Sequence, residues 1–304
     1  MQRRYVTADV FTDTMFGGNP VAVVLDAQGL STAQMQCIAI EFNYSETTFV
    51  LPPEDAAHTA KVRIFTPARE VPFAGHPNVG TAFVLAQQMQ RLGQTLPPSF
   101  TFEEGAGHVP LRLISENNTI VGAELTAPEA LSLRATTTPE NIAACLTLNA
   151  TDIETISHLP QVASVGLPFL IAEIKTRDAL RRIVQNQVAF KALLPFDGAH
   201  GLFAYTRDVG EGADCDLQAR MFSIRMIEDP ATGSAVVAAT AFLTHLLDVE
   251  SGDLSLRIRQ GVDMGRPSLL LSHGRKENGL VTSARVGGQC VTVLEGGFTL
   301  TGAA

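Results

Sequence analysis

The chain has no closely spaced cysteines: its four, at positions 37, 145, 215 and 290, are scattered and form no CxxC pair. This distribution indicates neither a zinc site nor a disulfide framework, and it is typical of buried or incidental thiols. No apolar run is long enough to span a bilayer. The N-terminal segment turns acidic at Asp9 before an apolar signal-peptide region develops, so we expect a cytoplasmic protein that is not bound to a membrane.

Basic residues are also few: 22 Lys and Arg stand against 31 Asp and Glu, which gives a net charge of -9. Such a balance argues against nucleic acid or an anionic membrane surface as a partner. The sequence contains no Gly-rich phosphate loop, no Rossmann fingerprint, no H-E-x-x-H and no nucleophile-elbow Ser. Proton chemistry on a small acid without a cofactor is the enzymatic interpretation that remains.

The chain does have the length and apolar content for two domains, with 304 residues of which 45% are hydrophobic. The composition shifts to Pro, Ala and Ser around residues 126–133, where we place a boundary between an N-terminal lobe, 1–126, and a C-terminal lobe, 127–284. The last segment, 285–304, could complete the first lobe. Strands that follow one another with few helices between them predict an α+β fold rather than a doubly wound sheet.

The pattern of apolar residues and turn residues predicts the main elements. We expect helices from a capping box at 31–34 to residue 42, at 80–88 and at 177–185. Near the end, segments 280–286 and 289–294 predict a hairpin that turns at Gly287-Gly288. Strands are expected at 5–10, 21–25, 47–51, 61–65, 107–114, 119–125, 168–174 and 201–206.

Two stretches, 65–85 and 222–243, look like copies of one device. Each runs from an extended apolar segment through an acidic residue into a Gly-containing turn, and then into an Ala- and Val-rich run. This is the pattern of a strand, a tight loop and a helix N-terminus. Two such loops predict a duplicated domain with one active site between two lobes.

The first loop carries His76, within Gly75-His76-Pro77. A histidine at a helix N-terminus beside a glycine has exposed backbone N–H groups next to it, which suits an anionic ligand. A neutral imidazole can also donate or accept a proton. The alternative is a loop histidine that only hydrogen-bonds to a backbone carbonyl.

The second loop brings Asp229, Thr232, Gly233 and Ser234 together before an Ala-rich helix. Each of the polar residues is a good N-cap, and a structural role as a cap is the alternative interpretation. A cap needs only one such residue, however, and a cluster of N–H and hydroxyl donors predicts a nest for a substrate carboxylate.

Glu46 opens an apolar strand after Asn43-Tyr44-Ser45. A glutamate in this position is usually solvated. If the strand instead starts at the domain cleft, the carboxyl group is a candidate for general acid/base catalysis.

These residues carry a resemblance to the PhzF-like family, the phenazine-biosynthesis isomerase group that shares its fold with diaminopimelate epimerase. The matching motifs extend over nearly the whole chain and include Gly18-Asn19-Pro20, Asn43-Tyr44-Ser45-Glu46-Thr47, Gly75-His76-Pro77, Glu228-Asp229-Pro230-Ala231-Thr232-Gly233-Ser234 and Val286-Gly287-Gly288. The resemblance implies two similar α+β domains, each a mostly antiparallel sheet wrapped round a central helix, with the active site in the cleft between them. It also implies a homodimer and no cofactor.

By the same resemblance, Glu46 moves a proton on a small carboxylic acid, with His76 and Asp229 as its catalytic partners. Asn19, Gly75, Pro77, Thr232, Gly233 and Ser234 are then the substrate-binding residues. The related epimerases use one cysteine from each repeat loop, but this chain has Ala74 and Pro230 near those places, so we do not expect a two-thiol racemase. An amino-acid epimerase or a lyase that uses Glu46, and a catalytically silent binding protein on the same fold, remain as alternatives.

Overall fold

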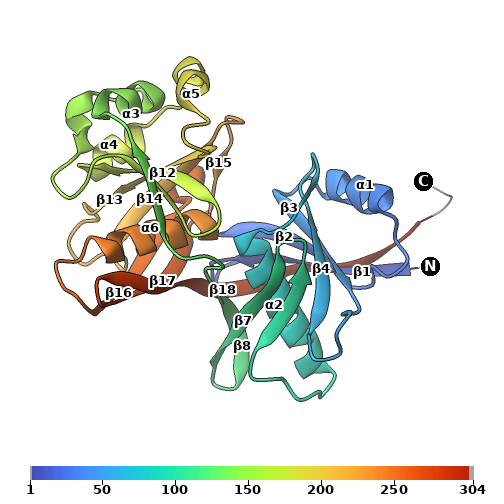
Figure 1. The fold of residues 1–304 in the computed structure, drawn as a ribbon. Helices are drawn as coiled ribbons and strands as arrows, with labels where there is room; N and C mark the ends of the chain where they lie inside the picture. The colour runs from blue at the N-terminus through green and yellow to red at the C-terminus, as the bar shows by residue number, and fades with distance from the viewer. Residues whose placement is uncertain (1, 301–304) are drawn as a thin grey trace. The chain divides into compact units, whose positions relative to one another are not determined.

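The structure is a computed structural model that describes residues 2–300 (Figure 1). The chain divides into two compact units. Unit 1 runs to Leu125 and resumes at Gly287, and unit 2 is Thr126–Val286. Both units combine much sheet with few helices. Within residues 2–300, the helices are all too short or too polar to cross a bilayer.

Unit 1 is a sheet closed into a ring around one helix. The strands follow one another round the ring in the order β1, β2, β3, β4, β6, β7, β8 and β18, and β18 pairs with β1 again. The pairs β2–β3 and β4–β6 are parallel. The pairs β1–β2, β1–β18, β3–β4, β6–β7 and β7–β8 are antiparallel. The strands are β1 (Gln2–Val10), β2 (Asn19–Val24), β3 (Glu46–Leu51), β4 (Ala60–Phe65), β5 (Glu70–Val71), β6 (Phe100–Glu104), β7 (Gly107–Glu116), β8 (Thr119–Thr126) and β18 (Leu280–Thr299), the last shared with unit 2.

Helix α2 (Gly75–Arg91) lies inside this ring, against β1, β2, β3 and β7 (Figure 1). Its residues from Gly75 to Val84 are all buried, which a helix with a single apolar stripe could not achieve. Gly80 shows how close the packing is, since a Cβ there would lie 2.6 Å from a Val21 methyl carbon and 2.8 Å from one of Val10. Helix α1 (Thr32–Phe42) covers the outer face and begins with the predicted Ser31–Gln34 capping box.

Unit 2 is a second sheet that carries helices on both faces. Pairings run β9–β11–β12–β13–β14–β16–β17, mostly antiparallel, with β12–β13 and β14–β16 parallel. Helix α6 (Gly233–His245) is buried against β11, β12, β16 and β17. The strands are β9 (Ser132–Thr136), β10 (Ile153–Glu154), β11 (Gln161–Ser164), β12 (Pro168–Ile174), β13 (Gly201–Thr206), β14 (Leu217–Ser223), β15 (Glu228–Asp229), β16 (Gly252–Gln260) and β17 (Ser268–Glu277).

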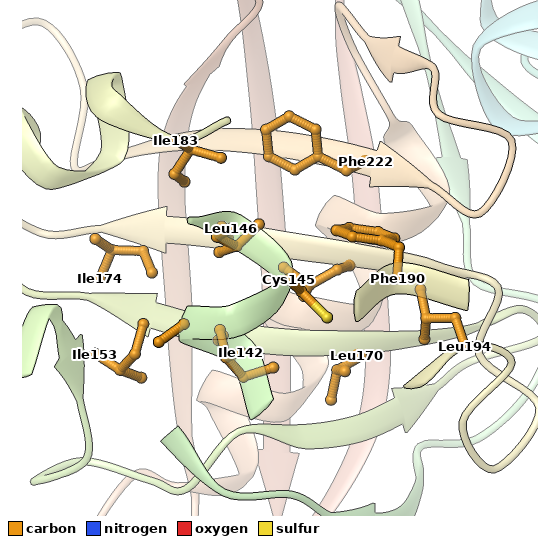
Figure 2. Packing of buried hydrophobic residues seen from close by; sticks show 14 of the residues in the cluster. Ile142, Cys145, Leu146, Ile153, Leu170, Ile174, Ile183, Phe190, Leu194 and Phe222 are labelled. Atoms are coloured by element: carbon orange, nitrogen blue, oxygen red, sulfur yellow. The ribbon is translucent and has the colours of Figure 1, made fainter. Parts of the chain in front are cut away.

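A layer of short helices packs on the other face of this sheet: α3 (Pro139–Leu146), α4 (Arg177–Arg182) and α5 (Gln187–Leu193) (Figure 1). Side chains of these helices interlock with Leu170 and Ile174 of β12 and with Phe222 of β14 (Figure 2). Such apolar burial stabilises a domain by roughly 25 cal/mol per Å² removed from water. The layer holds β12 and β14 in place, and β12 is one of the strands against which α6 packs.

The predicted hairpin at Gly287-Gly288 is wrong. Strand β18 is continuous there, and the turn lies earlier, at Asn278-Gly279, where both residues have positive φ (50° and 79°). A Cβ on Gly287 would lie 2.7 Å from the Ala123 carbonyl oxygen. The glycine pair therefore permits the close approach of β8 and β18 instead of a chain reversal.

Candidate functional site

His76 occupies the first turn of α2 and is 6% exposed. No side chain caps this helix terminus, where the N-cap is Ala74. Burial lowers the pKa of His76 to about 3, although a hydrogen bond to the Pro20 carbonyl acts in the opposite direction. The ring is therefore neutral in the physiological range.

The two nitrogens of His76 have different surroundings. Nε2 is buried and makes no hydrogen bond within the described chain, so the nitrogen bonded to Pro20 is Nδ1. An Nδ1–H that donates to a carbonyl leaves Nε2 with its lone pair. That lone pair is a proton acceptor inside unit 1.

Glu46 lies close to this acceptor. Its Oε2 lies 3.5 Å from Nε2 of His76, and its side chain is 20% exposed. Glu46 begins β3, beside Val21 of the parallel strand β2. Glu46 is therefore not a solvated glutamate at a strand end. Its carboxyl group is mostly buried and lies beside His76.

Two packing contacts hold the pair together. Gly80 lets α2 approach β2, so that His76 reaches the Pro20 carbonyl. The residue after Gly80 gives the second contact: the Thr81 hydroxyl of α2 is hydrogen-bonded to the Thr48 hydroxyl of β3 at 2.8 Å, and both residues are fully buried. Because Thr48 follows Glu46 by two residues, this bond fixes the start of β3 relative to the first turn of α2.

The remaining candidates of unit 1 surround this pair. Asn19 is 1% exposed and accepts a hydrogen bond from the Ser45 hydroxyl at 3.1 Å, directly before Glu46. Gly75 and Pro77 flank His76 and are buried in the same helical turn. Unit 1 therefore gathers Asn19, Glu46, Gly75, His76 and Pro77 at one end of its ring.

The candidates of unit 2 form a loop with its own hydrogen-bond frame. The Thr232 hydroxyl donates to Asp229 Oδ2 and does not cap α6. The buried Gln260 amide donates to the Asp229 carbonyl (2.7 Å) and to the Thr232 hydroxyl (3.0 Å), and it accepts from the Thr232 N–H (3.1 Å). The carboxyl of Asp229 is thus fixed by the loop itself.

The N-terminus of α6 follows directly. Gly233 is buried, Ser234 is half-buried, and no side chain caps the helix. Thr232 occupies the N-cap position, but neither its side chain nor any other makes a capping hydrogen bond to the helix. Uncapped N–H groups and the helix dipole favour a negative ligand group at such a terminus.

Each of the two repeated loops is preceded by an equivalent arginine–glutamate ion pair. In unit 1, Arg63 of β4 forms a bidentate pair with Glu70 of β5, with both N···O distances 2.7 Å. In unit 2, Arg220 of β14 does the same with Glu228 of β15, at 2.7 and 2.8 Å. Each arginine also stacks on a ring of its own strand, Arg63 on Phe65 and Arg220 on Phe222.

These pairs close the short hairpins that lead to the two helices. Glu70 precedes Gly75 by five residues, and Glu228 precedes Gly233 by five. The same spacing places His76 of one unit at the position of Ser234 in the other. We call the two pairs the hairpin clamps.

No role in the site was predicted from the sequence for Pro20, Gln260 or the two clamp arginines. Their roles depend on contacts between distant segments: Gln260 lies 28 residues from Thr232. His158 is another buried histidine, 8% exposed, and its Nε2 is hydrogen-bonded to the Tyr205 hydroxyl. Across residues 2–300, no group of three or more His, Cys, Asp or Glu side chains has the arrangement of a metal site.

Comparisons with known proteins show which family and fold this chain resembles. The family model for phenazine biosynthesis-like proteins, PhzC-PhzF, matches residues 8–296. An uncharacterized isomerase of Mesorhizobium japonicum is 38% identical, over 97% of this chain and 98% of the relative. The trans-2,3-dihydro-3-hydroxyanthranilate isomerase of Pseudomonas chlororaphis is 34% identical, over 97% and 99%. The crystal structure of a PhzF-family protein of Bacillus anthracis superposes with a TM-score of 0.86 at 24% identity, over 99% and 100% of the two chains.

Proposed function

The chain belongs to the phenazine biosynthesis-like family and is an isomerase, and from this premise we propose that it moves a proton between two carbons of a small unsaturated carboxylic acid. The observation that carries the proposal is the 3.5 Å contact between Glu46 Oε2 and Nε2 of a neutral, buried His76. General acid/base catalysis needs a proton-transferring group and a geometry that holds it, and this contact supplies both. No cofactor is part of the proposal.

The proposed reaction is an allylic proton shift. Glu46 as a carboxylate removes a proton from one carbon, the electrons of that C–H bond form a new double bond, and the old double bond takes the proton at its far carbon. While Glu46 carries the proton, its O–H donates to the lone pair on Nε2 of His76. Because His76 is neutral, it stabilises the protonated carboxyl without competing for the proton.

The loop of unit 2 is proposed to bind the substrate carboxylate. Support comes from the N-terminus of α6, which no side chain caps, and from the Ser234 hydroxyl beside it. Asp229 then serves as a second polar group toward the same substrate. We also predict that one substrate contacts the residues of both units in a shared cleft. A further prediction is that the enzyme is a cytoplasmic homodimer.

The first test is turnover of trans-2,3-dihydro-3-hydroxyanthranilate, the compound in the relative's name. Glu46→Gln should lower kcat by about 10²–10⁴-fold, because the amide cannot accept the proton. Glu41→Gln, an exposed glutamate on α1, is the matched control and should leave turnover unchanged. Near-normal turnover by Glu46→Gln would refute the proposed role.

Product analysis in deuterated water separates the neighbouring reactions. Label at one carbon together with a shifted double bond identifies the proposed isomerase. Inversion at the labelled centre would identify an epimerase, and a lost fragment a lyase. If small unsaturated acids bind but neither this compound nor any of them reacts, the chain is a silent binding protein and the proposal is wrong.

A further inference from the structure

A buried carboxyl group behind the first turn of α2 has no part in the chemistry proposed above. Glu104 ends β6, and both of its carboxyl oxygens are buried without a well-formed hydrogen bond. Asn78, two residues after His76, is fully buried, and its side-chain oxygen and nitrogen also lack a well-formed hydrogen bond. A native fold rarely leaves such groups unexplained.

The two side chains face each other. Burial raises the pKa of Glu104 to about 8, and hydrogen bonding to Asn78 only partly opposes this rise. The four polar atoms of these two side chains make no hydrogen bond to any other group of the described chain. A neutral carboxylic acid can both donate to an amide oxygen and accept from an amide nitrogen, whereas a carboxylate can only accept.

The turn that carries Glu104 also holds the loop before α2. The Ala106 N–H donates to the Pro72 carbonyl at 3.0 Å. Gly105 lies against the same residue, and a Cβ there would be 3.1 Å from the Pro72 Cα. Residues 104–106 therefore contact the chain on both sides of His76, at Pro72 before it and at Asn78 after it.

The charged groups around Glu104 leave it without a counter-ion. A cavity of about 550 Å³ beside it is lined by Lys61, Arg63, Glu70 and Glu103, and a neighbouring one of about 600 Å³ adds Glu54, Asp55, His58 and His108. Lys61 is paired with Glu54 and Arg63 with Glu70. Within the described chain, each of these two cations is already engaged by another carboxylate.

Glu103, the neighbour of Glu104, is the opposite case. It accepts from the Glu54 and Asp55 N–H groups at 2.7 and 2.8 Å and contacts His58 Nδ1 at 2.9 Å. These bonds lower the pKa of Glu103 to about 2. Two adjacent glutamates thus differ in protonation because Glu103 accepts from two backbone N–H groups and contacts His58, whereas Glu104 is buried with only the Asn78 amide beside it.

We propose that Glu104 is a positioning residue which, as a neutral acid bonded to Asn78, holds the first turn of α2 and thereby His76. The effect on turnover rests on the proposed function, but the effect on the helix does not. Ionisation of Glu104 places an uncompensated charge under this turn and loosens it. Replacement by glutamine keeps a donor and an acceptor and removes the ionisation.

The test compares wild type, Glu104→Gln, Glu104→Ala and the control Glu103→Gln. Hydrogen exchange of the backbone amides of residues 73–80 is followed from pH 5 to 9, corrected for intrinsic rates. In the wild type, the opening equilibrium of this turn should rise by up to tenfold per pH unit toward pH 8 and level off above it. Glu104→Gln should show no such rise, and Glu104→Ala should be open at every pH.

Glu103→Gln should keep the pH dependence of the wild type at this turn and raise exchange only at residues 54–58. Turnover gives the second measurement: the wild type should lose activity with a midpoint near pH 8, and Glu104→Gln should not. Identical pH profiles of the wild type and Glu104→Gln would overturn the inference, even if Glu104→Ala fails to fold. Absence of any turnover by the wild type would count against the proposed substrate, while the exchange data still decide the role of Glu104.

Discussion

Gln260 is one buried residue on which the loop 229–232 depends for its hydrogen bonds. It is 0% exposed, and its amide bonds to the Asp229 carbonyl and to both the hydroxyl and the N–H of Thr232. An apolar side chain of similar size would leave these loop groups buried without partners. Such orphaned groups cost more than the bonds themselves contribute.

Gln260→Leu should therefore destabilise unit 2 by about 2–4 kcal/mol and weaken binding at the α6 terminus. Gln185→Leu, which removes a single bond to the Ser223 carbonyl, is the control and should cost about 1 kcal/mol. Urea unfolding measures both variants. Equal losses for the two would show that the loop does not depend on Gln260.

Gly287 gives a second prediction for a single residue. A Cβ at this position meets the Ala123 carbonyl oxygen at 2.7 Å and the Glu124 Cα at 2.8 Å, both of them backbone atoms that cannot rotate away. Gly287→Ala should force β8 and β18 apart and cost at least about 1–3 kcal/mol in unfolding free energy. Gly201→Ala, whose new methyl group would be at ordinary contact distance of 3.4 Å, should cost clearly less.

Among the elements, the hairpin clamps are the best shared feature of the two units, and they differ in burial. Side-chain exposure is 11% and 20% for Arg220 and Glu228, but 24% and 39% for Arg63 and Glu70. Arg220 also donates to the carbonyls of Leu180 and Ile183 at the end of α4. The clamp of unit 2 therefore ties β15 to a helix as well as to β14.

Removing Arg220 should cost more than removing Arg63. Arg220→Met leaves Glu228 and the carbonyls at the end of α4 without their donor, for which we expect a loss of about 3–5 kcal/mol. Arg63→Met breaks a more exposed pair, worth about 1 kcal/mol. Amide exchange in each hairpin, together with urea unfolding, measures the difference; a larger loss for Arg63→Met would contradict this assignment.

Over the whole molecule, the sequence predicted what depends on local pattern. Strands such as Ala60–Phe65 and Gly201–Thr206, and the capping box at Ser31, follow from residues close together in the chain. The turn predicted at Gly287-Gly288 failed because a glycine pair indicates either a reversal or a close approach, and only the partner strand β8 decides between them. Strands β16 and β17 were not predicted at all.

The candidate site divides in the same way. The motifs around Glu46 and His76 identify both residues, but their 3.5 Å contact depends on Gly80, Thr48 and Thr81, none of which carries a motif. The support from Gln260 and Glu104 was not predicted because a buried polar residue looks like a surface residue until its environment is known. The contact between Glu46 and His76 and the buried supporting residues depend on packing between distant segments, which the local sequence pattern does not reveal.

Two buried titratable groups of unit 1 set opposite limits on its stability. The pKa of His76 is lowered by burial to about 3, so stability is lost as the pH falls from 6.5 toward 3, when only the unfolded chain binds the proton. The pKa of Glu104 is raised by burial to about 8, so stability is lost as the pH rises from 4.5 toward 8, when only the unfolded chain releases it. The two effects balance between about pH 5 and 6.

We therefore expect unit 1 to be most stable near pH 5–6 and to open before unit 2 at pH 8. In unit 2 burial lowers the pKa of His158, which adds a loss of stability on the acid side only. Amide exchange resolved by unit, recorded from pH 4 to 9, measures the profile. His76→Gln should flatten the acid side of unit 1 and Glu104→Gln the alkaline side. If unit 2 opened first at pH 8, or if neither substitution changed its side of the profile, these buried groups would not control the stability of unit 1.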